Sequence, residues 1–283
     1  MNVLIVFAHP EGRSLNAALR DVAVAELERG GHQVQVSDLY ARRWKSEIDR
    51  ADFPWLAPGE RLNVPAASKQ AFTEDMLTED VRAEIEKLLW ADMVILQFPL
   101  WWFSMPAILK GWVERVFAYG LAYGVGEHSD LRWGDRYGEG SFAGKRAMLI
   151  VTAGGWAPHY SARGINGPIE DLLFPINHGI LYYPGFEVLP PFLLYEADRL
   201  SDADFAGASE ALRARMRNLE QTDPIPYRRQ NGGDYLIPSC ELRPELGEGA
   251  WGFDLHLRTD KEEPSYLHAV EMHAARSTKR DVG

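Results

Sequence analysis

Residues 93–112 read MVILQFPLWWFSMPAILKGW, and this stretch decides the fold. Residues 93–98 form an almost continuous apolar run, which is typical of a strand buried on both faces of a parallel sheet. Pro99 and Pro106 then enclose an aromatic loop, and Pro106 suits the first position of a helix. A membrane span needs about 20 apolar residues without internal prolines. We therefore expect a strand, a loop and a helix here, and no membrane insertion.

Strand and helix patterns alternate on both sides of this stretch. Further strands are expected at 3–8, 33–37, 146–152 and 187–195, and helices at 14–29, from Thr78 or Glu79, from Pro106, at 168–178 and at 202–219. Residues 42–78 have no clean period and predict a long surface excursion. This alternation predicts an α/β fold, a doubly wound, parallel, five-stranded sheet with helices on both faces.

The chain divides into two segments by composition. Residues 1–221 carry the alternating pattern and are expected to form one domain. Residues 222–283 are rich in Pro, Gly and aromatic side chains and become strongly charged after Asp260. We expect this irregular C-terminal extension to pack on the core or on a dimer partner, with a frayed end.

Charge and cysteine content exclude several classes of function. Lys and Arg total 30 and Asp and Glu total 41, giving a net charge of −11, so the chain lacks the basic surface of a nucleic-acid binder. Cys240 is the one cysteine, and the eight histidines have no metal-binding spacing, so neither a disulfide nor a metal site is expected. The first apolar run is too short for a signal peptide, which favours a cytoplasmic location.

Ligands bind at the carboxyl ends of the strands in open parallel sheets, so the loops that follow the strands matter most. The loop from His9 to Asn16 opens a helix, where free N–H groups and the side chains of Ser14 and Asn16 could hold an anion. A simpler interpretation is that Ser14 only caps the helix. The loop has neither a dinucleotide-binding G-x-G-x-x-G pattern nor a P-loop.

Two further loops complete the expected site. Trp101, Trp102 and Phe103 offer planar side chains for stacking on a planar ligand, although they could instead fill a dimer interface or the core. Gly154 and Gly155 let the backbone approach a ligand closely, although they could form an ordinary turn. All three loops are expected at one sheet edge. An anion cradle, an aromatic wall and a glycine floor together favour a flavin.

At these residues the chain resembles the NAD(P)H:quinone oxidoreductase (DT-diaphorase) family, which has a flavodoxin-like fold. The resemblance covers about residues 2–220. The matching segments are Ala8-His9, Ser14-Leu15-Asn16, Gln97-Phe98-Pro99-Leu100, Trp102-Phe103, Pro106-Ala107-Ile108-Leu109-Lys110-Gly111-Trp112, Thr152, Gly154-Gly155 and Tyr160-Ser161.

The resemblance implies a flavoenzyme that is a homodimer with one FAD per subunit. NADH or NADPH would reduce the flavin, and a quinone would reoxidise it in a ping-pong, two-electron hydride transfer. Two alternatives stay open. One is an FMN-dependent azo or nitro reductase, and the other is a flavin-carrying redox regulatory subunit of another protein.

The resemblance also assigns site residues by position. Those expected to hold the flavin are His9, Ser14, Leu15, Asn16, Asn63, Pro99, Leu100, Trp101, Trp102, Phe103, Thr152, Ala153, Gly154, Gly155 and Tyr160. Those expected to line the substrate pocket are Trp102, Phe103, Tyr123, Val125, Gly154, Gly155 and Tyr183. The family residue that matches Tyr123 comes from the second subunit, which implies a composite pocket.

The expected catalytic positions are Tyr160, His159 and Asn166, and here the chain departs from the family pattern. Asn166 stands where the family has a histidine that assists the tyrosine, and an amide cannot carry a proton at neutral pH. His159 is a candidate replacement because a histidine titrates near neutrality. Residues 127–140 are additional to the family pattern and lengthen a loop near the mouth of the pocket.

Overall fold

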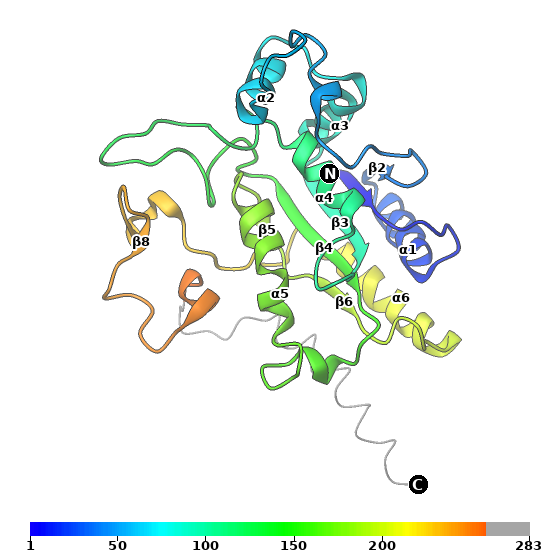
Figure 1. Ribbon diagram of the computed structural model, residues 1–283. Coiled ribbons are helices and arrows are strands. Elements are labelled where there is room, and N and C mark those ends of the chain that lie inside the picture. Colours follow the sequence, from blue (N-terminus) through cyan, green and yellow to red (C-terminus); the bar gives the residue numbers. More distant parts are fainter. Residues whose placement is uncertain (259–283) are drawn as a thin grey trace.

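The computed structural model describes residues 1–258, which form a parallel sheet between two layers of helices (Figure 1). Four long strands pair side by side in the order β2-β1-β3-β4, and two short strands, β5 and β6, both pair with β4. Every pair in this sheet is parallel, which confirms the predicted fold class. The strands are β1 Asn2–Phe7, β2 Gln33–Asp38, β3 Met93–Pro99, β4 Arg146–Thr152, β5 Glu187–Val188 and β6 Phe192–Leu194.

The fifth strand is interrupted, so its prediction as one element over 187–195 was wrong. β5 pairs with the start of β4 and β6 pairs with its end. Pro190 and Pro191 lie between them. Proline has no backbone N–H and cannot donate to a ladder, so the pairing stops there and resumes two residues later.

Helices cover both faces of the sheet. α1 (Leu15–Arg29) and α6 (Asp202–Arg217) lie on one face, and α3 (Glu79–Trp90), α4 (Ala107–Val116) and α5 (Ile169–Ile176) lie on the other. Successive residues of a strand point to opposite faces. Val3 and Ile5 therefore pack in the core under α1 and α6, whereas Leu4 and Val6 pack in the core under α3, α4 and α5.

The excursion over 42–78 contains elements that the sequence pattern did not predict. They are η1 (Arg50–Asp52) and α2 (Val64–Thr73). Ala67 and Ala71 of α2 form a small core with Phe53, which follows η1. Only a few apolar positions of α2 face this core, so no period shows in the sequence. Pro106 lies one position earlier than predicted, as the residue that caps α4.

The described part of the extension packs on the chain's own core. The backbone N–H of Ile225 donates to the oxygen of Val188 at 2.7 Å, and Tyr227 is buried in the core of the α3–α5 face. The extension adds η4 (Gln230–Asp234), β7 (Tyr235–Leu236), β8 (Glu241–Leu242) and η5 (Gly252–His256). The expected frayed end, 259–283, lies outside the described residues.

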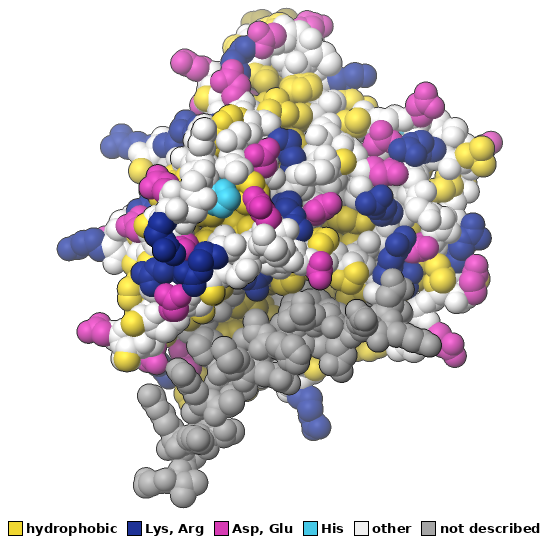
Figure 2. Space-filling model, turned by 180° about the vertical axis from the view of Figure 1, so that it is seen from behind, with side chains coloured by type: hydrophobic (Ala, Val, Ile, Leu, Met, Phe, Trp, Pro, Cys, Tyr) yellow, Lys and Arg dark blue, Asp and Glu magenta, His cyan; other side chains and the backbone are white. Residues whose placement is uncertain are grey.

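The surface carries both signs of charge. Figure 2 shows the face opposite to that of Figure 1, where Asp and Glu side chains lie among Lys and Arg side chains. Among the described residues, no helix is long and apolar enough to cross a membrane. The apolar stretch 93–109 is divided between β3, a loop and α4, as predicted.

A column of aromatic rings joins the extension to the helical turn η3 (Asn177–Tyr182). The ring of His178 stacks between those of Phe174 and Tyr137, at 4.5 Å and 4.7 Å, and Phe253 of the extension stacks on Phe174 at 4.1 Å. His178 is buried, and its Nε2 atom has no partner among residues 1–258. Burial, with the nearby His256, lowers the pKa of His178 from 6.5 to about 3.

This burial predicts a loss of stability in acid. The folded protein keeps His178 neutral, whereas the unfolded chain binds a proton there below about pH 6.5. The free energy of unfolding should therefore fall as the pH drops from about 6.5 towards 3, by up to about 1.4 kcal/mol per pH unit. Chemical denaturation between pH 7.5 and 4.5 measures this slope.

Replacing His178→Phe should flatten the slope, because the ring stack is kept and the titrating group is lost. His128→Phe is the matched control, since His128 is exposed and should leave the slope unchanged. An unaltered slope in His178→Phe would show that other groups cause the acid sensitivity.

Candidate functional site

Buried hydrogen bonds bring the three predicted loops together at the carboxyl edge of the sheet. Asn16 at the start of α1 donates through Nδ2 to Oγ1 of Thr152 at 2.8 Å. Gln97 near the end of β3 donates through Nε2 to the backbone oxygen of Asn16 at 2.7 Å. The backbone N–H of Leu100 donates to the oxygen of Thr152 at 2.8 Å. Each loop is thus tied to at least one of the others.

The first loop has the character of an anion site. Ser14 caps α1 by accepting a hydrogen bond from the N–H of Ala17 at 3.1 Å, as the simpler interpretation expected. The N–H groups of Leu15 and Asn16 precede the first intrahelical donor and donate to no acceptor within residues 1–258. The N–H of Glu11 donates to Nδ1 of His9 at 3.1 Å, and in the tautomer that accepts this bond the Nε2–H of His9 is a further donor.

The second loop is a tight turn that displays aromatic rings. Trp101 and Ser104 exchange two backbone hydrogen bonds of 3.0 Å. The two central residues, Trp102 and Phe103, have φ values of +49° and +62°. This left-handed conformation costs about 1–3 kcal/mol for each bulky residue and is typical of functional sites. Trp102 is 94% exposed and Phe103 48% exposed, so the strain presents apolar rings to solvent.

The third loop places glycine directly beneath a tyrosine. A Cβ atom added at Gly155 would lie 2.9 Å from Cε2 and 3.1 Å from the hydroxyl of Tyr160. A Cβ atom at Gly154 would lie 3.0 Å from a carboxylate oxygen of Asp198. Within residues 1–258, the N–H groups of Gly154 and Gly155 donate to no acceptor. The backbone therefore offers two donors beside the ring of Tyr160.

Sequence reasoning missed two neighbours of this loop. Asp198 lies against Gly154, and Tyr195 lies against Tyr160 with ring centroids 5.5 Å apart. Burial raises the pKa of Tyr195, which keeps its hydroxyl protonated. Both residues follow β6, about 40 positions after the loop, so no local pattern could have linked them to it.

The residues at this edge fit a flavin. Rings from the aromatic turn suit an isoalloxazine, and the free N–H groups suit its phosphates and ring edge. The side-chain oxygens Oδ1 of Asn16 and Oε1 of Gln97 are buried, and no donor among residues 1–258 reaches either atom. They are acceptors of the kind that the ribityl hydroxyls of a flavin require. Asn16 itself is only 4% exposed, so its side chain chiefly ties the loops together.

One predicted flavin-site residue, Asn63, and two predicted catalytic residues, His159 and Asn166, have other contacts. Asn63 is exposed and caps α2, where its Oδ1 accepts from the N–H of Ala66 at 3.3 Å. His159 is exposed, and its ring stacks on Trp156 at 6.0 Å rather than on Tyr160. The N–H of Asn166 donates to the backbone oxygen of His159 at 3.0 Å, which is a turn contact.

The other predicted substrate residues, Tyr123, Val125 and Tyr183, lie away from this edge, towards the start of the strands. Tyr183 comes just before β5, whose first residue pairs with Arg146 at the start of β4. Thr152 ends β4, about 20 Å away for a strand of this length. Tyr123 lies two positions before Val125, whose oxygen accepts from the N–H of Asp135 at 2.8 Å, and Tyr137 of the same loop donates to the oxygen of Tyr183 at 2.8 Å. Burial raises the pKa of Tyr123, and a hydrogen bond with Ser68 opposes this shift. One chain thus keeps the two halves of the expected pocket apart.

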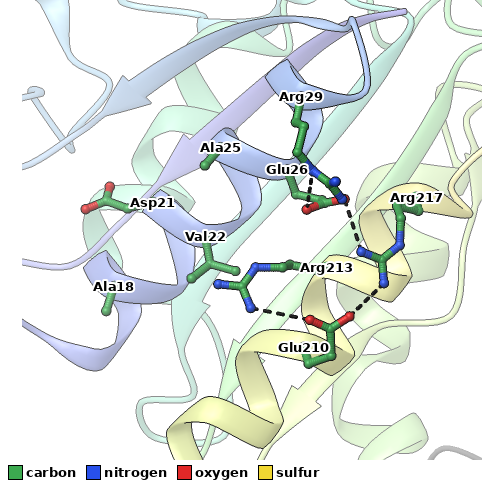
Figure 3. Close-up of a pocket in the computed structure, with 9 residues that line it drawn as sticks. All are labelled: Ala18, Asp21, Val22, Ala25, Glu26, Arg29, Glu210, Arg213 and Arg217. Atoms are coloured by element: carbon green, nitrogen blue, oxygen red, sulfur yellow. Dashed lines mark hydrogen bonds and ion pairs between the residues drawn. The ribbon is translucent and has the colours of Figure 1, made fainter.

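A hollow of about 580 Å³ lies between α1 and α6 (Figure 3). Its charged groups are already paired: Glu26 with Arg29 and Arg217, Glu210 with Arg213 and Arg217, and Asp21 with Arg20 outside the hollow. None of its residues belongs to the three loops. Across residues 1–258, no cluster of His, Cys, Asp and Glu could hold a metal ion.

Comparisons with known proteins agree with this fold. A family model for the flavodoxin-like fold matches residues 1–218. A ribosyldihydronicotinamide dehydrogenase-like protein of Penicillium crustosum is 62% identical over 263 residues, 93% of this chain and 97% of the relative. The human ribosyldihydronicotinamide dehydrogenase (quinone) is 39% identical over 225 residues, 79% of this chain and 94% of the relative.

A solved structure gives the same result. A Klebsiella pneumoniae protein assigned as a quinone reductase superposes with a TM-score of 0.89 at 62% identity, covering 91% of this chain and all of that one. The chain therefore belongs to the flavodoxin-like NAD(P)H:quinone oxidoreductase family.

Proposed function

We propose that this protein is an FAD-dependent enzyme that transfers two electrons from NADH or NADPH to a quinone by a ping-pong mechanism. The observation that carries the proposal is the convergence of three loops at one sheet edge. There an exposed aromatic turn faces a glycine floor beside Tyr160, and free N–H groups open α1. The names of the relatives support quinone as the acceptor.

A bound flavin supplies the hydride chemistry, and the protein supplies binding, orientation and electrostatics. The N–H groups of Leu15 and Asn16 and the Nε2–H of His9 would hold the phosphates. Trp102 and Phe103 would exclude water from the flat ring. Tyr160, pressed against Gly155, would donate a hydrogen bond at the ring edge where negative charge develops.

The active unit is proposed to be a homodimer. Tyr123, Val125 and Tyr183 lie at the edge of the sheet opposite to Trp102 and Phe103. They can line the same pocket only when a second copy brings its opposite edge to the flavin site. The closed pocket would then contain both edges, one from each chain, in keeping with the two-fold symmetry of most dimers.

Gly155→Ala should weaken flavin binding, because the added Cβ would lie 2.9 Å from the ring of Tyr160 and displace it. We expect the dissociation constant for FAD, measured by fluorescence titration of the apoprotein, to rise about 10-fold or more. Gly207→Ala on α6 is the matched control, since its Cβ would meet nothing within 4 Å.

The same preparation tests which flavin is bound. Chromatography of the cofactor released from the native protein should show FAD. FMN would favour the azo or nitro reductase alternative, and protein that takes up neither flavin would remove the basis of the proposed site.

Both substrates should use the same space above Trp102 and Phe103, so they cannot bind together. Initial rates against quinone concentration at several NAD(P)H concentrations should therefore give parallel double-reciprocal lines. Intersecting lines would indicate a ternary complex and separate binding places. Reduction of the flavin by NAD(P)H without any steady-state turnover of acceptors would instead favour the regulatory subunit.

Tyr160 should act at the ring edge without the imidazole of His159, because that ring stacks on Trp156. Tyr160→Phe should slow flavin reduction in stopped flow by about 10-fold or more. General acid–base groups usually contribute about 100-fold to 10,000-fold. His159→Ala should change the rate by less than about 2-fold across pH 5.5–8. An equal loss in both variants would identify His159 as the replacement for the histidine missing at Asn166.

A further inference from the structure

The additional loop 127–140 runs between two residues expected to line the substrate pocket. The backbone N–H of Asp135 donates to the oxygen of Val125 at 2.8 Å. The N–H of Tyr137 donates to the oxygen of Tyr183 at 2.8 Å. Their neighbour, Arg136, therefore lies between the two lining segments, so this loop belongs to the wall of that half of the pocket.

The extension fixes the loop in this position. Gln230 donates through Nε2 to the oxygen of Trp133 at 2.6 Å, and its backbone N–H donates to the oxygen of Tyr137 at 3.3 Å. Asn231 donates to the oxygen of Gly134 at 2.8 Å. The loop and the extension thus form one unit, and both are additions that the family pattern does not require.

Arg136 has no acidic ion-pair partner in this unit. Its guanidinium lies 5.8 Å from the centre of the Tyr183 ring, and its Nε donates to Oε1 of Gln230 at 2.6 Å. Among residues 1–258, no Asp or Glu lies within ion-pair distance of it. Arg132 of the same loop, in contrast, pairs with both Asp135 and Glu139.

The contacts of Arg136 hold its head group in place and leave donors for a ligand. Nε donates to Gln230, Nη2 lies 4.0 Å from Sγ of Cys240, and the ring of Tyr183 supports one side, which leaves further donors among the five N–H groups of the guanidinium. The forked arrangement of these donors matches a carboxylate in two hydrogen bonds. A half-buried, oriented and uncompensated cation favours an anion as its partner.

We propose that Arg136 is a specificity-determining residue that binds an anionic substituent, a carboxylate or a group of like charge, on the electron acceptor. This inference rests on the proposed function, because it places Arg136 in the half of the pocket that one chain contributes to its partner. The preferred acceptor is then a quinone that carries a negative charge rather than a neutral one.

A matched pair of acceptors tests the proposal: a naphthoquinone with a propionate side chain, and the corresponding primary amide. The two share the quinone ring and differ in charge. The native enzyme should show a kcat/KM for the acid about 10-fold or more above that for the amide. Arg136→Gln should bring the ratio close to one, and Arg136→Lys should retain part of it.

Arg132→Gln is the control for charge in the same loop, and it should keep the preference because Arg132 is already paired within the chain. Melting temperatures should show that all variants stay folded with the extension in place. An equal acid-to-amide ratio in the native enzyme and in Arg136→Gln would overturn the inference while quinone reduction itself still stood.

A binding measurement separates this inference from the proposed function. Calorimetric titration of the flavin-loaded protein with 2-naphthoate and with 2-naphthamide needs no turnover. We expect the naphthoate to bind about 10-fold more tightly, with the difference lost in Arg136→Gln and reduced by salt. If neither quinone is reduced, the proposed function fails. Equal binding of the two probes would then also remove the role of Arg136.

Discussion

The site depends on one set of buried hydrogen bonds, in which Asn16 joins Thr152 and accepts from Gln97. These residues come from α1, β4 and β3, so the side chain and the backbone oxygen of Asn16 together fix the relative positions of three loops. Each such bond contributes about 0.5–1.5 kcal/mol, and a buried partner left without it costs about 1–3 kcal/mol. The cost of breaking these bonds keeps the three loops in fixed relative positions. The aromatic turn can then hold Trp102 and Phe103 in a strained, exposed conformation.

The same topology explains why the two groups of expected pocket residues lie at opposite edges of the sheet. A parallel sheet needs crossover connections, so α4 and α5 begin at the edge that carries the flavin loops and return to the opposite edge. The segments that follow them, with Tyr123 and Tyr183, are thereby placed about one strand length from Trp102. The additional loop and the extension are built on that far edge. They can change which acceptor is selected without disturbing the flavin site.

Much of the fold and of the flavin edge was predictable because those signals are local. The apolar run of β3, the prolines around the aromatic loop and the Ser14 cap are each contained within a few residues. The break at Pro190, the short helix α2 and the burial of the Asn16 side chain were not predictable. They depend on partners far along the chain, such as Thr152, 136 positions after Asn16. The role of Arg136 was not predictable, because it depends on the lack of an acidic ion-pair partner among residues 1–258, and only the structure shows this.

The central claim is that each active site combines the flavin edge of one chain with the far edge of the other. Hybrid dimers test it most directly, when one chain carries Gly155→Val and a differently tagged chain carries Tyr123→Asp. Each variant alone should have little activity, because both of its sites are damaged. Purified hybrids should recover about half of the native activity, since one of their two sites receives both intact halves. Hybrids no more active than the two parents would contradict a shared site.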